Sequence, residues 1–346
     1  MIKASRILVP LAALALIAGC AKQQTLSSGQ KAKEYLELYM SRAYPDVVPD
    51  KWGIYVLEDI PGTGYEWNKE FAYTKLSSTI RSIDGTIVSS TEEDIAKQLD
   101  ENSYKSYNYY GPKYQNTSSG NGYAGLEYML EGMKVGGTKT AVIPSWLITS
   151  SRYNTKEEYI KASTSNTHLV YTITFAGQCG DIALQEKANL RQFVNENFGP
   201  DQKSCSYKKD MTEGTFYFVS DTTSFKEEDK RADDATLYLK YVGRRLDGVA
   251  FDTNDQETAL MEGLFVKERS YEKSKVVFSS TYSSITMDGT SSLVEGFLGG
   301  LYKMHWSGQK AIVLFVSNLG YGSTGSGNII PSYSPLIFEL ELFSNE

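Results

Sequence analysis

The chain has 346 residues, a length that allows about two domains with separate hydrophobic cores. Its 35 Lys and Arg residues against 42 Asp and Glu residues give a formal net charge of -7, which argues against a nucleic-acid partner because phosphate binding depends on clustered Lys and Arg. Only two His and three Cys residues are present, so a His-rich metal site is excluded, and we predict neither a metal nor a cofactor.

The first twenty residues are typical of a bacterial export signal. A short basic segment precedes an apolar run from Ile7 to Ala18, which is too short to span a bilayer. Gly19-Cys20 then resembles the lipobox, in which the cysteine is diacylated and becomes the mature N-terminus. An ordinary signal peptide with an incidental cysteine is the alternative. We expect residues 1–19 to be a signal peptide and Cys20 to anchor the chain in a bilayer of the bacterial cell envelope, with the outer membrane favoured and the face left open.

Export also bears on the two other cysteines, Cys179 and Cys205. An even pair in an oxidising compartment favours a disulfide bond between them. Two separate free thiols are the alternative. Neither cysteine has a histidine nearby in sequence that would indicate catalysis.

The hydrophobic patterns that follow predict a helix and then a first domain. Residues 20–49 form a polar tether and a helix that begins near Lys31 and ends at Pro45. Residues 50–178 form the first domain. Its predicted strands cover residues 53–57, 70–81, 139–144 and 168–176, and its predicted helix covers residues 122–133.

A linker and a second domain repeat this pattern. Residues 179–210 form the linker, which is mainly a helix over residues 181–198, and residues 211–346 form the second domain. Its predicted strands cover residues 215–219, 235–243, 274–278, 310–317 and 335–343, and its predicted helix covers residues 291–304. Several strands with a single helix, arranged twice, predict two α+β domains with antiparallel sheets.

One glycine motif matches the pattern of a dinucleotide site, but the residues after it oppose such a site. Gly320, Gly322 and Gly325 match G-x-G-x-x-G after a predicted strand. A dinucleotide site needs a helix directly afterwards, and Pro331 and Pro335 oppose one. We therefore predict no dinucleotide site here.

Three ordered segments of the second domain carry a family resemblance. They run from Tyr241 to Asp252, from Leu293 to Met304, and from Gly308 to Leu342. Their order resembles the FKBP-type peptidyl-prolyl cis-trans isomerase family over nearly all of residues 211–346. The resemblance implies a strongly bent antiparallel sheet wrapped on one short helix, with an apolar pocket between them.

The resemblance also implies which residues form that pocket. The helix contributes Phe297 at the pocket floor, where the family usually has Trp, and the Val294 backbone N–H is offered to a ligand carbonyl. The implied catalytic positions are Tyr241, Phe251, Asp252, Val294, Phe297, Tyr321, Ile330 and Phe338, and the implied substrate-binding neighbours are Leu293 and Ile329. Ordinary core packing is the alternative role for each aromatic residue taken singly.

The chemistry of the family suits these residue types. Rotation about an X–Pro bond faces a barrier of roughly 18–20 kcal/mol because the planar amide is stabilised by resonance. The twisted transition state has lost much of that charge separation, so a dry aromatic pocket favours it over the ground state. The reaction needs no nucleophile and no metal, and Asp252 and Tyr321 are expected to position the substrate backbone.

The first domain resembles the family only in outline. Its pocket positions have changed: Ser78 replaces Tyr, Val88 replaces Phe, Ser89 replaces Asp and Leu126 replaces Trp, whereas Tyr171 keeps an aromatic ring on the last strand. The resemblance also implies a flap before the last strand, which holds Tyr321 and Ile330 in the second domain, and residues 150–165 replace it in the first. We expect this domain to be inactive and to serve binding or spacing.

The sequence thus predicts a lipid-anchored folding factor whose second domain isomerises X–Pro bonds in exported, proline-containing polypeptides. A non-catalytic FKBP-like binding protein or chaperone of the envelope is the first alternative. A glycan-binding lipoprotein is the second, and it rests only on the 25 Tyr residues.

Overall fold

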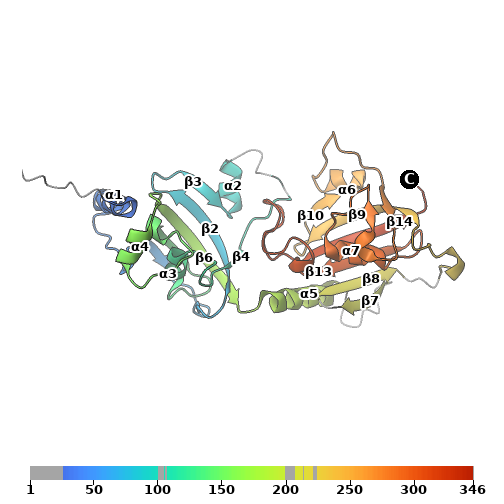
Figure 1. Cartoon of the computed structure of the whole chain (residues 1–346), viewed down its shortest axis with the longest axis horizontal. Coiled ribbons are helices and arrows are strands. Elements are labelled where there is room, and N and C mark those ends of the chain that lie inside the picture. The colour runs from blue at the N-terminus through green and yellow to red at the C-terminus, as the bar shows by residue number, and fades with distance from the viewer. Residues whose placement is uncertain are drawn as a thin grey trace, which may run out of the picture.

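The computed structural model describes residues 26–99, 105, 107–198, 207–212, 214–220 and 224–345. Two domains lie side by side along the long axis of the molecule, each with one antiparallel sheet (Figure 1). Cys20 and the predicted signal peptide lie outside the described residues, so the lipid anchor stays a prediction. Within the described part of the chain, no helix is both long and apolar enough to cross a bilayer.

The first sheet has the order β1-β5-β6-β2-β3, and β4 pairs with the same edge of β2 as β3 does. Helix α3 (Ala124–Leu130) packs on it through Leu126, Met129 and Leu130, which are buried because they recur at helical spacing on one face. The strands are β1 (Tyr55–Ile60), β2 (Tyr73–Ser82), β3 (Ile87–Ser90), β4 (Lys113–Asn116), β5 (Thr138–Ile143) and β6 (Leu169–Cys179).

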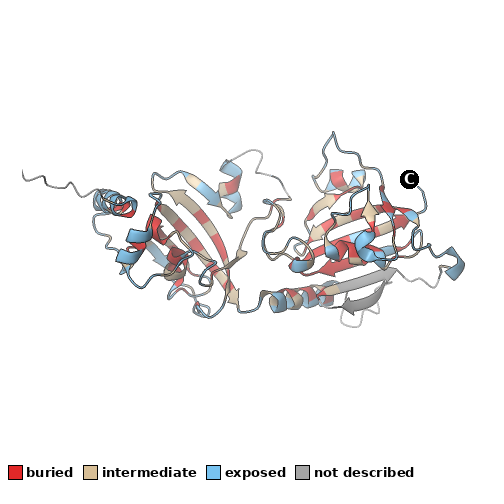
Figure 2. Ribbon diagram, viewed as in Figure 1, coloured by how far each residue is buried: buried red, intermediate tan, exposed pale blue. Residues whose placement is uncertain are grey.

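The second sheet has the order β12-β11-β9-β14-β13-β8-β7, and β10 also pairs with β9. Helix α7 (Glu295–Tyr302) covers its inner face, and Figure 2 shows that the buried residues gather on the strands and on this helix. The strands are β7 (Tyr207–Thr212), β8 (Thr215–Ser220), β9 (Thr236–Arg245), β10 (Ala250–Thr253), β11 (Ser274–Val277), β12 (Thr286–Met287), β13 (Lys310–Phe315) and β14 (Leu336–Phe343).

The two sheets are copies of one arrangement. The order β1-β5-β6-β2 in the first matches β8-β13-β14-β9 in the second. In both copies two short strands share one edge of the long strand, β3 and β4 on β2 and β10 and β11 on β9. The helix that packs on the inner face, α3 or α7, comes before the same strand in each copy, β5 or β13. The predicted α+β class with tandem domains is therefore confirmed by strand order and register.

The N-terminal helix is built into the first domain. Helix α1 (Ser28–Ala43) begins three residues earlier than predicted, because the side chains and backbones of Ser27 and Gln30 form a capping box. Its residues Leu36 and Met40 belong to the core of the first domain. It lies against α4 (Lys156–Ala162), the helix that replaces the flap, so this insertion serves packing.

His168 links this helix to the sheet and makes the first domain sensitive to acid. Its Nδ1 accepts from the Ser145 N–H at 3.1 Å, so its Nε2 donates to the Ala32 carbonyl at 3.0 Å. Burial lowers the pKa of His168 from 6.5 to about 4. The folded domain thus binds this proton less tightly than the unfolded chain. Its contribution to stability is complete above pH 6.5 and is lost as the pH falls toward 4.

We expect the first domain to lose about 2 kcal/mol of unfolding free energy over this pH window. Thermal unfolding between pH 6.5 and 4, followed by amide exchange in α1, measures the loss. His168→Gln keeps an acceptor and a donor but does not titrate, so its profile should be flatter. An equally steep profile in that variant would assign the acid sensitivity to other groups.

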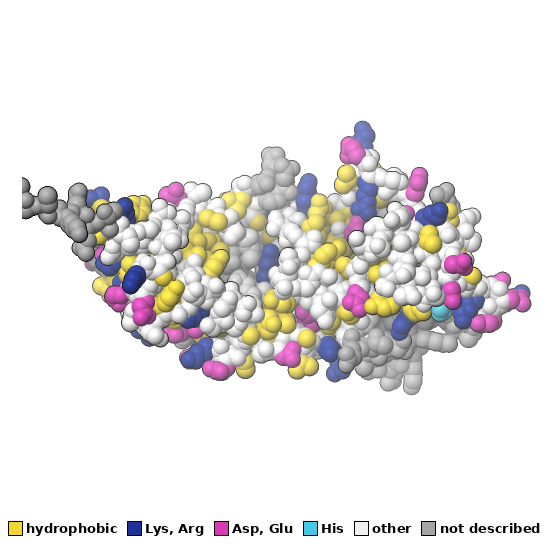
Figure 3. Space-filling view, in the orientation of Figure 1, with side chains coloured by type: hydrophobic (Ala, Val, Ile, Leu, Met, Phe, Trp, Pro, Cys, Tyr) yellow, Lys and Arg dark blue, Asp and Glu magenta, His cyan; other side chains and the backbone are white. Residues whose placement is uncertain are grey.

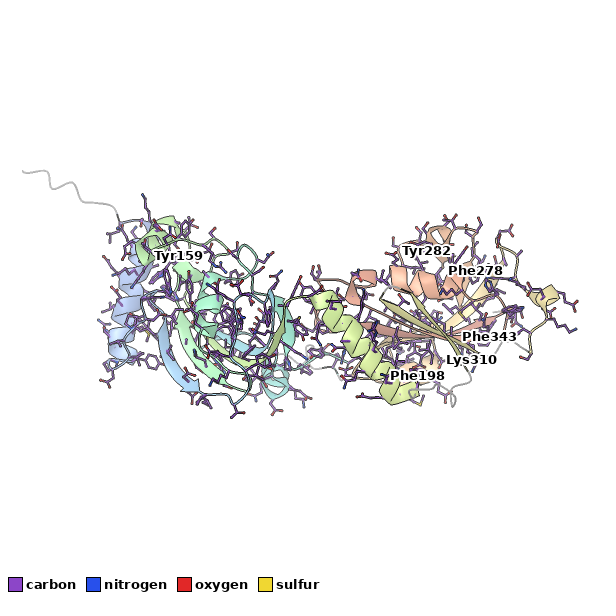
Figure 4. The ribbon with its side chains drawn as sticks, turned by 90° about the horizontal axis from the view of Figure 1, so that it is seen from below. Tyr159, Phe198, Phe278, Tyr282, Lys310 and Phe343 are labelled. Carbon is purple, nitrogen blue, oxygen red and sulfur yellow. The ribbon has the colours of Figure 1, made fainter. Side chains whose placement is uncertain are left out.

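The connecting helix is packed onto the second domain. Helix α5 (Ile182–Phe198) buries Leu190 and Val194 against Leu314 and Ile337 on the outer face of the sheet, and Figures 1 and 4 both show it lying along that domain. The buried Glu186 carboxylate also accepts a bond from the Ser317 hydroxyl at 2.7 Å. A helix that the sequence describes as a linker thereby supports the chain just after β13.

The predicted disulfide between Cys179 and Cys205 stays a prediction. Cys179 ends β6 as a half-buried free thiol, and Cys205 lies outside the described residues. Burial, followed by the charges of Asp181 and Glu186, raises the pKa of the Cys179 thiol. A raised pKa lowers the reactive thiolate fraction at neutral pH.

Candidate functional site

Five aromatic rings meet on the inner face of the second sheet. Phe338 on β14 lies at their centre, with ring centroids 5.0 Å from Phe297 of α7, 5.7 Å from Phe251 of β10, 5.8 Å from Phe315 of β13 and 6.4 Å from Tyr241 of β9. We call these five residues the aromatic cluster. Four of them are among the predicted site residues, and the fifth, Phe315, is not. Edge-to-face and stacked contacts of this kind stabilise beyond the area they bury.

Gly243 makes room for this cluster. It pairs with Phe338 across β9 and β14 and with Asp252 across β9 and β10. A Cβ atom on Gly243 would lie 2.7 Å from the Phe251 ring and 2.9 Å from the Phe338 ring, distances too short for real contacts. Any side chain at this position would therefore displace two rings of the cluster. Nothing in the sequence pattern around Gly243 indicates this role.

A closed polar network borders the aromatic cluster. The Tyr241 hydroxyl donates to Asp252 Oδ2 at 2.8 Å, and Arg269 Nη1 donates to Asp252 Oδ1 at 2.7 Å. Arg269 Nη2 also reaches the Tyr241 hydroxyl at 3.3 Å. Burial, together with the Asp252 carboxylate, raises the pKa of Tyr241, so the hydroxyl stays protonated and keeps donating. We call Tyr241, Asp252 and Arg269 the polar network.

Two hydrogen-bond donors at the site are free. The Val294 N–H, just before α7, has no acceptor among the residues that the structure describes. The Tyr321 hydroxyl likewise lacks a partner within these described ranges, and 38% of the residue is exposed. Burial, followed by the charge of Asp252, raises the pKa of Tyr321, which places this hydroxyl within electrostatic reach of the polar network. Both donors are available to a bound molecule.

The remaining predicted residues surround the cluster. Ile330 is buried in the second core, and Leu293, Val294 and Ile329 are half-buried against it. Tyr321, Ile329 and Ile330 belong to residues 320–335, which connect to β14 and which we call the flap. A hydrogen bond of 2.7 Å from the Ser326 N–H to the Ile330 carbonyl closes the tip of the flap.

The first domain lacks this site at equivalent positions. Its β2, β3 and β6 have the same register, so that Ile80 occupies the place of Gly243, opposite both Tyr171 and Ser89. The Ile80 side chain packs into the first core where the second domain leaves room for rings. Val88, at the position of Phe251, is 60% exposed. The first domain thus has neither the aromatic cluster nor the polar network.

A buried arginine ties the flap to the first domain. Arg245 on β9 is 3% exposed, and its Nη1 donates to the carbonyls of Ile329 at 2.8 Å and of Tyr107 at 2.5 Å. Its other nitrogens bind Asp247 at distances down to 3.0 Å. The Tyr109 N–H also donates to the Asn328 carbonyl at 2.7 Å. The sequence held no signal for this link, because its acceptors are backbone atoms of distant segments.

Removal of this arginine should loosen the flap. We expect Arg245→Met to cost about 3 kcal/mol, because the buried guanidinium is lost and two half-buried carbonyls and the Asp247 carboxylate lose their donor. Amide exchange in residues 320–333, followed by mass spectrometry, should accelerate. Arg244→Met, its outward-facing neighbour on the same strand, is the matched control and should leave that exchange unchanged. Equal acceleration in both variants would contradict the assignment.

Comparison with known proteins then identifies the second domain. Residues 266–343 match the family model of FKBP-type peptidyl-prolyl cis-trans isomerases. The second domain belongs to the FKBP family. The match contains Arg269, Phe297 and Phe338, whereas Tyr241, Phe251 and Asp252 precede it and join the site through β9 and β10.

Several FKBP proteins are similar to the chain. The FK506-binding protein 1A of Aspergillus fumigatus is 28% identical over 113 residues, which are 33% of this chain and 78% of that protein. The structure of three FKBP domains of wheat FKBP73 is 16% identical and covers 84% of this chain and 94% of that one, with a TM-score of 0.27. FkpA from Escherichia coli is 22% identical over 47% of this chain and 61% of its own, with a TM-score of 0.29. At these TM-scores, the tandem arrangement rests on the repeated strand order described above.

Proposed function

We propose that the second domain is a peptidyl-prolyl cis-trans isomerase that acts on proline-containing polypeptides. The observation that carries the proposal is the convergence of four predicted aromatic residues from four elements beside two free hydrogen-bond donors. Membership in the FKBP family supports the same reaction. We propose that the first domain, which has Ile80 in place of Gly243, is a binding or spacer domain and has no isomerase activity.

The aromatic cluster would supply the environment that the reaction needs. In the planar ground state the amide is polar, and in the twisted transition state the nitrogen lone pair and the carbonyl are no longer conjugated. Rings that exclude water therefore disfavour the ground state more than the transition state. The buried faces of Phe297 and Phe338 provide such surroundings, and Phe251, which is half-buried, borders solvent.

The polar groups would hold the substrate backbone in place. The free Val294 N–H would donate to a substrate carbonyl, and the free Tyr321 hydroxyl would donate to a second one. Both oxygens of Asp252 are already bound, by Tyr241 and by Arg269. Asp252 would therefore fix the Tyr241 ring, and its unused lone pairs would still allow it to accept from the substrate backbone, the role predicted for it.

A pair of matched variants tests the proposal and its location. In a protease-coupled assay of the full chain, Phe251→Ala combined with Tyr321→Ala should remove most of the catalysed rate. Val88→Ala, at the equivalent position of the first domain, should leave the rate unchanged. A double variant as active as the wild type would reject the second domain as the active one. Suppressed aggregation of an unfolded client without any isomerase activity would select the chaperone alternative.

We further propose that the chain is exported and lipid-anchored through Cys20 and serves folding in the cell envelope. The basic segment, the apolar run and Gly19-Cys20 support this proposal. Labelling of the protein with a radioactive fatty acid in cells, compared with Cys20→Ser, tests it. Equal labelling of both proteins, or of neither, would reject the anchor.

A further inference from the structure

A basic cleft lies between the two domains. It has a volume of about 300 Å³ and combines first-domain strand residues with the end of the flap. Figure 3 shows dark-blue basic side chains in the hollow between the domains with yellow side chains on both sides. The residues of this inter-domain cleft that matter here are Lys75, Tyr109, Lys113, Tyr114, Arg245 and Tyr333.

The positive charges of the cleft exceed what the protein itself neutralises. Asp247 pairs with Arg245 at 3.0 Å. Lys75 and Lys113 have no carboxylate partner in the described part of the chain. Burial, and then the charge of Arg245, lowers the pKa of Lys113, so its charged form is not stabilised by the surrounding protein. Lys75 and Lys113 are thus available to bind an anion, although the chain as a whole has a formal net charge of -7.

One aromatic ring lies beside each of these two cations. The Lys75 Nζ lies 5.6 Å from the centroid of Tyr114, and the Lys113 Nζ lies 5.9 Å from the centroid of Tyr109. On the flap side, Tyr333 packs edge-on against Tyr73 at 5.2 Å and has φ of 58°, a left-handed conformation that side chains rarely adopt. The cleft therefore offers apolar surface next to positive charge, and one wall of it holds a strained residue in place.

We propose that the inter-domain cleft binds a carboxylate of an acidic segment in the client polypeptide. A carboxylate would accept from Lys75 or from Lys113, both of which line the cleft, and the rest of the segment would cover the tyrosine rings. A free inorganic anion would use the lysines but not the rings, which favours a polypeptide. The proposal rests on the proposed function in one respect, because its occupant is a client chain. Ile329 and Ile330 of the isomerase site continue directly into Pro331 and Tyr333 of the cleft wall, so one client can reach both.

Binding of two matched peptides to the full chain tests this proposal. Each peptide contains one X–Pro bond, and the residues on one side of it are Glu in the first and Gln in the second. Fluorescence anisotropy at low ionic strength should show that the Glu peptide binds about tenfold more tightly. The difference should shrink at about 1 M salt, where charges are screened.

Lysine variants locate the effect. Lys75→Gln combined with Lys113→Gln should abolish the preference for Glu. Lys69→Gln combined with Lys275→Gln makes the same charge change at exposed lysines outside the cleft and should retain it. Loss of the preference in both pairs would assign it to net charge and overturn the proposal, as would equal binding of the two peptides by the wild type.

Two further outcomes separate the possible explanations. Inorganic phosphate that competes with an affinity equal to that of the Glu peptide would overturn the polypeptide assignment in favour of a small-anion site. The measurement detects binding alone, so a chain without isomerase activity that still prefers the Glu peptide would reject the isomerase and keep the cleft. A chain with isomerase activity but no preference for the Glu peptide would keep the isomerase and reject the cleft.

Discussion

Phe338→Ala should be the most damaging single substitution in the second domain. We expect it to lower the free energy of unfolding of this domain by about 3–5 kcal/mol, because truncating a buried phenylalanine leaves a cavity. Isomerase activity should fall with it, since Phe338 touches all four other rings of the aromatic cluster. Amide exchange in β9 and β14 measures the stability, and the protease-coupled assay measures the activity.

Tyr171→Ala is the matched control for that substitution. Tyr171 occupies the equivalent position on the last strand of the first sheet and is 6% exposed. It should destabilise the first domain and leave the isomerase rate unchanged. Full activity of the Phe338→Ala variant, or an equally large loss in Tyr171→Ala, would contradict a catalytic role of the aromatic cluster.

Asp252→Ala should have the second-largest effect on catalysis. It leaves the Tyr241 hydroxyl without its acceptor and Arg269 without its ion pair, and the Tyr241 ring loses its fixed orientation. Because the Asp252–Arg269 pair is more than a third exposed, we expect only about 1 kcal/mol of lost stability. We expect the specificity constant kcat/KM to fall by about tenfold, which corresponds to about 1.4 kcal/mol of transition-state stabilisation.

A double-mutant cycle tests whether the polar network acts as one unit. Tyr241→Phe and Arg269→Met each remove one partner of Asp252. Their combined effect on kcat/KM should be clearly smaller than the sum of the single effects, since the second change removes contacts that the first has already weakened. Ser89→Ala, at the position of Asp252 in the first domain, should be neutral. Additive losses in the cycle would show that the three side chains act independently.

Much of the fold could be predicted from the sequence, because its strands are long and alternate. The pattern over residues 168–176 predicted β6, and the helices near Ala124 and Ile182 were expected within two residues of their observed starts. Two other short helices were missed. Helices α2 (Glu93–Leu99) and α6 (Gln256–Met261) bury one alanine each, so they have no apolar face for a pattern to reveal.

The candidate site could be predicted only in its family-related part. Arg269 was missed because it lies in the long segment between Thr253 and Thr290, whose course the sequence does not define, and only folding brings it to Asp252. Gly243 was missed because its importance depends on two rings contributed by other strands. The same holds for Arg245, which binds carbonyls of residues far from it in sequence. Such roles follow from tertiary contacts.

Exchange spectroscopy by NMR on a short X–Pro peptide would detect the proposed isomerase site of the second domain without a coupling protease. Without catalysis, cis and trans forms interconvert over tens to hundreds of seconds, too slowly for exchange peaks between them. The full chain at a small fraction of the peptide concentration should produce such peaks, and the combined Phe251→Ala and Tyr321→Ala substitutions should remove them. Absence of exchange peaks with the folded wild-type chain would contradict an isomerase site in the second domain.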